Sequence, residues 1–291
     1  MKRFILAPVI IFVLAACSAP VAPLATPVPA ITQVFVVATP VPQATPVLAP
    51  TVAPTPTALV TASANGDPAI VPILMYHHLA DLPPDASELR RTWTVAPKNF
   101  QAQIEWLAQH GFHTITMEQL VAHLKQRQPL PTKPIVISFD DGWEDGYTVA
   151  YPILKKNGFI GTFFIYTNPV DHKSYVTWAQ LQEMAAAGMD IQAHTLTHPH
   201  LRDLAPDAAL KEIAESKTIL EKRLGKPIVA LAYPFGEYNQ AIIAMLKRAG
   251  YESAVTLAAG YRQRPDELFT LHRIRVSFAD SLDEFAGRLP N

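Results

Sequence analysis

Two adjacent carboxylates, Asp140 and Asp141, follow a short apolar run and are the residues of this sequence that most need a chemical explanation. The run at 135–137 is β-branched and lies between a proline and a glycine, which is typical of a buried strand. Carboxylates inside an apolar core are destabilising unless they are paired, protonated or bound to a metal. The pair is therefore either a solvated turn at a strand end or part of a functional site.

Two histidines, His194 and His198, could supply further ligands to such a site. Their spacing would place both on one face of a helix, but the threonines between them and the proline after them oppose a helix. A loop leaving a strand at 189–193 can still direct both imidazoles to one point; two surface histidines on a turn are the alternative. Two imidazoles and a carboxylate leave zinc an open position for water, and cobalt, nickel or manganese also suit them.

Hydrolysis is the chemistry that this set of residues favours. Adjacent strand residues point to opposite sides, so Asp140 and Asp141 cannot easily flank one bond as the two carboxylates of a glycosidase do. Where the strand ends and the backbone turns, one carboxylate can bind the metal while its neighbour reaches the water. Zinc lowers the pKa of bound water to about 7, and the neighbouring carboxylate can then act as a general base.

The elements that must position these residues alternate between strand and helix. Helices are expected at 96–110 and 206–224, where apolar residues recur on one face. Alternation of this kind implies a parallel sheet, open or closed, with ligands bound at the carboxyl ends of its strands. The expected strands are 70–76, 112–116, 135–139, 160–166, 189–193, 228–233, 252–257 and 268–276.

Composition separates this folded part from the amino-terminal part of the chain. The net charge of −1 argues against bulk affinity for nucleic acid, so no nucleic-acid partner is expected. Many of the 27 prolines fall between residues 19 and 68, in a Pro, Thr, Ala and Val segment that predicts an extended, disordered tether. From residue 69 to 291 the composition suits one barrel-sized domain.

The first residues have the layout of an export signal. Lys2 and Arg3 precede an apolar run at 4–16, which is too short to span a bilayer. The run ends in Leu-Ala-Ala-Cys, which resembles the lipobox of bacterial lipoproteins. That resemblance implies removal of residues 1–16, lipidation of Cys17, and a 17–68 linker that holds the domain at the outer face of the cytoplasmic membrane or in the cell envelope. A secreted protein with a chance cysteine is the alternative.

Three motifs in order resemble those of one enzyme family. They are FDDG at 139–142, HTLTHP at 194–199 and YPFG at 233–236. They look like the successive motifs of the polysaccharide deacetylases, the family with the NodB homology domain, carbohydrate esterase family 4. PILMYHHL at 72–79 further resembles the branch that deacetylates poly-N-acetylglucosamine. The resemblance covers most of 69–276 and implies a deformed (β/α) barrel with about seven parallel strands. It also implies Asp140 as the base and Asp141, His194 and His198 as metal ligands.

The YPFG motif carries further implied roles. In the family the backbone N–H of the aromatic residue after the proline, here Phe235, forms the oxyanion hole. Tyr233 and Phe235 could also stack on a sugar face, although a buried aromatic turn would equally explain Tyr233. The family's usual arginine, which orients the base, is replaced by Ala232, and Arg273 or Arg275 is the expected substitute.

The remaining candidates are histidines and tryptophans. The family's last motif ends in a histidine that protonates the leaving amine, which implies His272, unless that residue is an exposed strand histidine. His77 and His78 are expected near the same rim and compete for this role or for substrate binding. Trp143 and Trp178 could stack on sugars, but packing is the default for both.

Two hypotheses of different classes follow. The first is a metal-dependent deacetylase that hydrolyses the N-acetyl groups of an envelope or extracellular N-acetylglucosamine polymer. The second is a catalytically inactive carbohydrate-binding lipoprotein with the same fold. Ala232 supports the second hypothesis, whereas the intact carboxylate pair and both histidines support the first.

Overall fold

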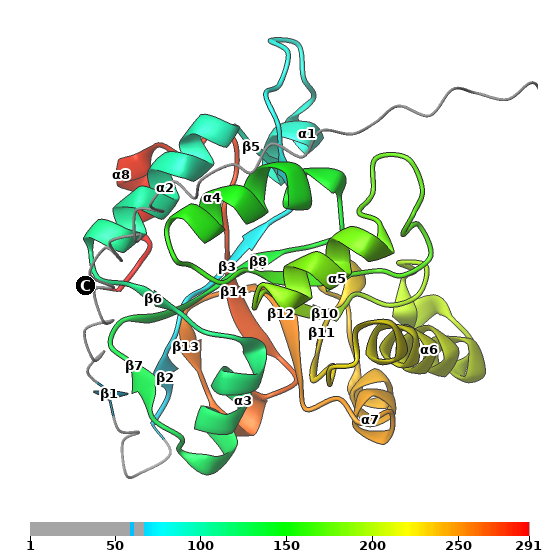
Figure 1. Cartoon of the computed structure of the whole chain (residues 1–291). Coiled ribbons are helices and arrows are strands. Elements are labelled where there is room, and N and C mark those ends of the chain that lie inside the picture. Colours follow the sequence, from blue (N-terminus) through cyan, green and yellow to red (C-terminus); the bar gives the residue numbers. More distant parts are fainter. Residues whose placement is uncertain (1–58, 61–66, 291) are drawn as a thin grey trace, which may run out of the picture. The chain divides into compact units, whose positions relative to one another are not determined.

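Seven parallel strands close into a barrel in this computed structural model, which describes residues 59–60 and 67–290. β8 pairs with both β3 and β9, and this double pairing closes the ring (Figure 1). The expected deformed barrel is confirmed. The seven strands, in order round the barrel, are β3 (Ile73–Tyr76), β14 (Leu271–Arg275), β12 (Ser253–Ala259), β11 (Ala230–Ala232), β10 (Asp190–Ala193), β9 (Thr162–Ile165) and β8 (Pro134–Phe139).

The eighth expected strand, at 112–116, is short and stays outside the ring. Only β6 (His113–Thr114) forms there, and it pairs with the first residues of β8. The other short strands make antiparallel or parallel pairs at the periphery. These pairs are β2 (Ala69–Ile70) with β13 (Arg262–Gln263), β4 (His78–Leu79) with β5 (Thr94–Val95), and β1 (Leu59–Val60) with β7 (Leu130–Pro131).

Helices cover the outside of the barrel (Figure 1). The expected helices at 96–110 and 206–224 are confirmed as α2 and α6, and α2 buries Phe100, Ile104 and Leu107 at the spacing of one helical face. Thr116 and Thr177 form capping boxes at the starts of α3 and α5. The helices are α1 (Glu88–Trp93), α2 (Pro97–Gln109), α3 (Met117–Gln126), α4 (Tyr151–Lys156), α5 (Trp178–Ala186), α6 (Pro206–Leu224), α7 (Gln240–Arg248) and α8 (Leu282–Gly287).

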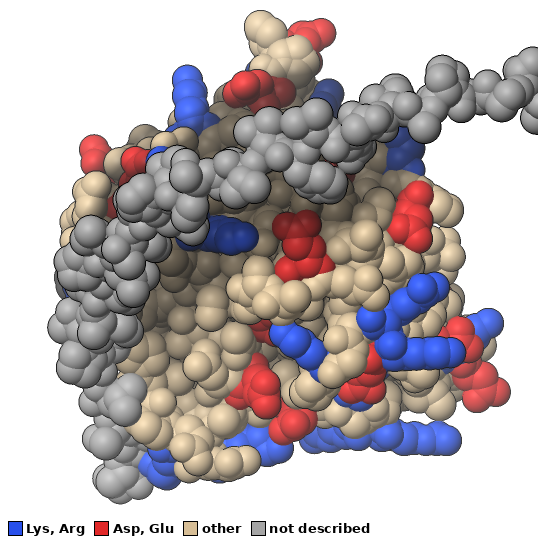
Figure 2. Space-filling model, viewed as in Figure 1, with Lys and Arg blue, Asp and Glu red and all other residues tan. Residues whose placement is uncertain are grey.

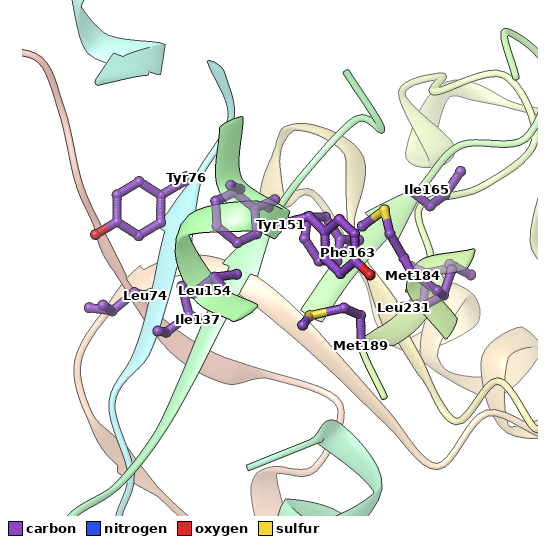
Figure 3. Packing of buried hydrophobic residues seen from close by; sticks show 14 of the residues in the cluster. Leu74, Tyr76, Ile137, Tyr151, Leu154, Phe163, Ile165, Met184, Met189 and Leu231 are labelled. Atoms are coloured by element: carbon purple, nitrogen blue, oxygen red, sulfur yellow. The ribbon is translucent and has the colours of Figure 1, made fainter. Parts of the chain in front are cut away.

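The main core fills the space between the strands and the outer helices. Figure 3 shows side chains of β3, β8 and β9 packed against residues of α4. Phe139 stacks on Phe163 with ring centroids 4.8 Å apart. Tyr76 also stacks on Phe139, with ring centroids 5.4 Å apart. Each large apolar side chain buried in this way contributes about 1.5–3 kcal/mol relative to exposure. The packing holds the end of β8, and therefore the carboxylate pair, in a fixed position.

Most of the predicted signal and tether falls outside the residues that the structure describes. The signal at 1–16, Cys17 and most of the 17–68 linker belong to this part. Within the predicted tether, Leu59–Val60 differ from the expectation because they pair with the exposed edge of β7. Among the described helices, none has the length and apolarity needed to cross a membrane.

Candidate active site

The carboxyl ends of the barrel strands bring the predicted site residues to one cleft of about 610 Å³. Asp140 follows β8, His194 follows β10 and Tyr233 follows β11, and parallel strands present these ends at one mouth. The volume is in the usual range for a ligand pocket, roughly 300–1,000 Å³. The predicted residues that line the cleft are His77, His78, Asp140, Asp141, Trp143, His194, His198, Tyr233 and Phe235.

Asp141, His194 and His198 converge as a candidate metal-binding triad. Oδ1 of Asp141 lies 3.4 Å from Nε2 of His194 and 3.5 Å from Nε2 of His198. Nδ1 of His194 lies 2.7 Å from the carbonyl oxygen of Ala232, so Nδ1 carries the proton and leaves Nε2 free to bind a metal. Among the described residues this is the group whose ligand atoms lie within 4.8 Å of one another. Two nitrogens and one oxygen fit a divalent ion such as zinc.

Backbone strain directs these ligands. Asp141 has φ = 75°, and His198 has φ = 60°, both in the left-handed region that side chains rarely adopt. Such residues cost about 1–3 kcal/mol each and persist where the surroundings enforce them. Here Glu212 of α6 accepts hydrogen bonds from the backbone N–H groups of Leu196 and Thr197 at 3.0 and 2.8 Å. The loop that carries the histidines is therefore braced by a carboxylate that the sequence motifs did not single out.

Asp140 has a different partner, the guanidinium of Arg273. Nη1 of Arg273 lies 2.8 Å from Oδ1 of Asp140, and the residues are 1% and 2% exposed. Nε of Arg273 donates to the carbonyl of Thr256 at 2.9 Å, which fixes the orientation of the guanidinium. Burial acts to raise the pKa of Asp140, but the charge and hydrogen bond of Arg273, together with the charges of His77 and His194, hold the pKa below its usual range. Of the two expected substitutes for the missing arginine, Arg273 reaches the carboxylate, while Arg275 lies over the Trp93 ring at 4.2 Å.

The structure does not place His272, the acid that the motif implied, among the residues of this cleft. Neighbouring residues of a strand point to opposite faces, so the inward Arg273 turns His272 outward. Its Nδ1 lies 3.4 Å from the carbonyl of Arg262, and its Cβ faces Gly260. His77 occupies the cleft instead, with Nε2 3.9 Å from Oδ2 of Asp140.

The ionisation of the cleft histidines follows from their surroundings. Burial lowers the pKa of His77, although the charges of the two aspartates oppose this shift. Burial and the neighbouring His194 lower the pKa of His198 to about 4, so its imidazole is neutral at pH 7. A neutral imidazole is the form that binds a metal. His78 instead pairs with Asp145 at 3.0 Å.

The aromatic candidates differ in how far they are buried and in what they contact. Tyr233 is buried and its hydroxyl donates to the carbonyl of Phe269 at 3.1 Å, as expected for a buried aromatic turn. Phe235 is 47% exposed and has φ = 57°, with His200 stacked on its ring at 3.8 Å. Trp143 lines the cleft and its Nε1 donates to Oδ2 of Asp141 at 3.0 Å, so it supports a triad member. Trp178 lies outside the cleft.

The fold and the Asp, His, His cluster define the class of protein. It is a closed α/β barrel with a site suited to hydrolysis. The sequence pattern described as polysaccharide deacetylase matches residues 127–254. YxkH of Bacillus subtilis (strain 168), a chain assigned to the polysaccharide deacetylases, is 35% identical over 210 residues, 72% of each chain. This chain belongs to the polysaccharide deacetylase family.

Two further relatives carry more specific names. The poly-beta-1,6-N-acetyl-D-glucosamine N-deacetylase of Staphylococcus epidermidis is 28% identical over 201 residues, 64% of this chain and 69% of its own. The Streptococcus pyogenes deacetylase PplD, solved in complex with acetate, superposes with a TM-score of 0.72 at 30% identity, covering 77% of this chain and 100% of that one.

Proposed function

We propose that this protein hydrolyses the N-acetyl groups of N-acetylglucosamine residues in a cell-envelope or extracellular polysaccharide, in a metal-dependent reaction that releases acetate. The observation that carries the proposal is an ionised Asp140 beside the Asp141, His194 and His198 cluster in one cleft. The Staphylococcus epidermidis relative, named as a poly-beta-1,6-N-acetyl-D-glucosamine N-deacetylase, supports the substrate class.

In the proposed mechanism Asp140 accepts a proton from the water that attacks the acetamide carbonyl. Arg273 keeps the carboxylate ionised and oriented, because its guanidinium is itself anchored to Thr256. A divalent ion held by Asp141, His194 and His198 would polarise the carbonyl and lower the pKa of water to about 7. The backbone N–H of Phe235 would donate to the oxyanion as negative charge develops.

The leaving nitrogen needs a proton, and His77 is the group proposed to deliver it. Its Nε2 lies 3.9 Å from Asp140, so a proton taken from water by the carboxylate can be passed on through the imidazole. The carbon–nitrogen bond breaks, a carbon–oxygen bond to the water oxygen has formed, and the products are acetate and a free amine. This role replaces the one that the sequence motif implied for His272.

Acetate release tests this function. The full-length protein, stripped with a chelator and reloaded separately with zinc, cobalt, nickel or manganese, should release acetate from an N-acetylglucosamine oligomer. The chelated protein should not. A metal-loaded protein that binds the oligomer without releasing acetate would instead support the alternative, a catalytically inactive carbohydrate-binding lipoprotein.

The proposed location is the outer face of the cytoplasmic membrane or the cell envelope, with the membrane reached through lipidated Cys17. The lipobox resemblance and the Pro, Thr-rich 17–68 linker support it. Cells fed a labelled fatty acid should incorporate the label into the wild-type protein and not into Cys17→Ala. Equal labelling of both proteins would count against this anchor.

A further inference from the structure

A second hollow shares a wall with the catalytic cleft. The loop after β10 contributes His194 and His198 to the cleft, whereas Leu196, between them, lines a separate open groove of about 780 Å³. Its polar lining comes from the loop after β9, from α5 and from the end of α6. The polar and aromatic side chains of this α5–α6 groove are Thr167, Asn168, Trp178, Gln182, Lys222 and Arg223.

The hydroxyl of Thr167 is buried in this groove without a hydrogen-bond partner. Thr167 is 6% exposed, and its Oγ1 makes no hydrogen bond in the described part of the chain. The backbone N–H of the same residue donates to the carbonyl of Thr195 at 3.2 Å, so its position is fixed. Buried hydroxyls are nearly always hydrogen-bonded, so this hydroxyl in the wall of a ligand-sized hollow needs a partner, which is either a water molecule or a ligand.

The groove also carries positive charge that nearby carboxylates do not neutralise. The described residues that line it include Lys222 and Arg223 and no Asp or Glu. Neither basic side chain forms an ion pair within the described residues, unlike Lys217, which pairs with Glu221 on the same helix at 2.8 Å. Figure 2 shows basic and acidic side chains close together on the side of the molecule where Figure 1 places α6.

Trp178 and Gln182 hold Arg223 in place. The guanidinium carbon of Arg223 lies 5.1 Å from the centroid of the Trp178 ring, a cation–π contact. Nε2 of Gln182 donates to the backbone carbonyl of Arg223 at 3.0 Å. A guanidinium restrained by such contacts loses less freedom when it binds a carboxylate or phosphate through two hydrogen bonds.

We propose that the α5–α6 groove binds an anionic saccharide unit, bearing a carboxylate or a phosphate, at a distance along the polymer from the acetamide under attack. The inference rests on the proposed function for the identity of the polymer as a glycan. Arg223 and Lys222 bind the anion, and Thr167, Asn168 and Gln182 bind sugar hydroxyls. The groove therefore selects acid-bearing glycans, and it repels the free amines that deacetylation produces.

Basic residues in the last turn of a helix also complement its dipole, which would explain Lys222 and Arg223 without a ligand. The chain offers a matched control. Lys247 and Arg248 occupy the last turn of α7, are exposed, and do not line the groove, while Lys247 lies over an aromatic ring at 5.2 Å.

Calorimetric titration of the full-length protein with three tetrasaccharides tests the proposal. The probes are an N-acetylglucosamine tetramer, its 6-phosphorylated form, and a tetramer in which N-acetylmuramic acid supplies carboxylates. At low salt, the wild type should bind at least one acidic probe about tenfold more tightly than the neutral one. The double variant Lys222→Gln, Arg223→Gln should lose this preference, and Lys247→Gln, Arg248→Gln should keep it. The better acidic probe identifies the anion.

Thr167→Val supplies a second, independent measurement. If the hydroxyl meets a ligand, the variant should bind the preferred acidic tetramer several-fold more weakly, although the fold itself should be no less stable. Unchanged affinity, or a wild type without charge preference, would overturn the proposal. Acetate release from the neutral tetramer should be unchanged in all these variants. If the wild type released no acetate, that result would count against the proposed function. The binding measurements would still decide whether the groove binds acidic saccharides.

Discussion

The two halves of the catalytic cleft differ although they start from neighbouring residues. Asp140 is buried and salt-bridged to Arg273, and its own backbone does not adopt the left-handed conformation. Asp141 is 16% exposed, has a left-handed backbone, and faces the imidazoles of His194 and His198. One half presents a carboxylate held by a fixed cation, and the other presents three ligand atoms.

This difference supports the separate tasks proposed for the two carboxylates. A carboxylate with a permanent cationic partner remains available to exchange a proton without losing its position. A carboxylate beside two imidazole nitrogens, with a tryptophan N–H on its second oxygen, is organised to share a cation with them. The contrast predicts that substitutions in one half remove turnover and those in the other half remove metal.

Asp140→Asn should give the largest loss of activity. The amide keeps the shape of the side chain but cannot accept the proton from water, so acetate release should fall by about a hundredfold or more. Metal content, measured by atomic spectroscopy on the same sample, should match that of the wild type. A variant that loses its metal would erase the distinction between the two halves.

Asp141→Asn should act through metal affinity. Loss of a direct ligand should weaken metal binding by more than the roughly 10–100-fold that follows from losing a residue that only hydrogen-bonds to a ligand. Titration with zinc, followed by acetate release, should show partial recovery at high metal concentration. Asp140→Asn should show no recovery under the same titration, and recovery of both variants would contradict the assignment.

His77→Gln and His272→Gln compare the histidine in the cleft with the one that the motif implied. Removing the proton donor of the leaving nitrogen should slow acetate release by about a hundredfold. His272→Gln should remain within about threefold of the wild type, because its side chain faces Arg262 and Gly260 outside the cleft. Comparable losses in both variants would restore His272 as the acid.

The sequence was sufficient for the barrel and for the residues that form the metal cluster. Alternating strands and helices, the apolar run before Asp140, and the motif order place polar residues at strand ends, which parallel topology then gathers. The sequence also predicted the need for a substitute arginine. It named two candidates, because Arg273 and Arg275 share one strand face and their inward or outward direction depends on register.

Register is also why the sequence could not show whether His272 faces the cleft. A one-residue shift exchanges the two faces of a strand, and hydropathy would place an arginine outward rather than bury it. The observed arrangement depends on a pairing between Asp140 and Arg273, which are 133 positions apart. Glu212 and Thr167 carry no motif at all, because their importance arises only from where α6 and the loop after β9 lie in space.

Arg273→Gln is the variant with the smallest expected change in rate. It tests whether the Arg273 cation keeps Asp140 ionised. Burial would then raise the pKa of Asp140 against only the charges of His77 and His194, so the ionised fraction at acidic pH should fall. The acidic limb of the pH–rate profile should move to higher pH, with a modest loss at the optimum. Loss of one partner of a buried pair should also lower the free energy of unfolding by about 3–5 kcal/mol, measurable by urea titration.

Arg275→Gln is the control, since this neighbouring guanidinium lies over Trp93 and does not contact the carboxylate. Its acidic limb should coincide with that of the wild type. If Arg273→Gln lowered the rate equally at every pH, Arg273 would act only by holding the shape of the cleft. A shift confined to the acidic limb, absent from Arg275→Gln, would show that Arg273 keeps Asp140 ionised, because only a change in protonation gives a pH-dependent loss.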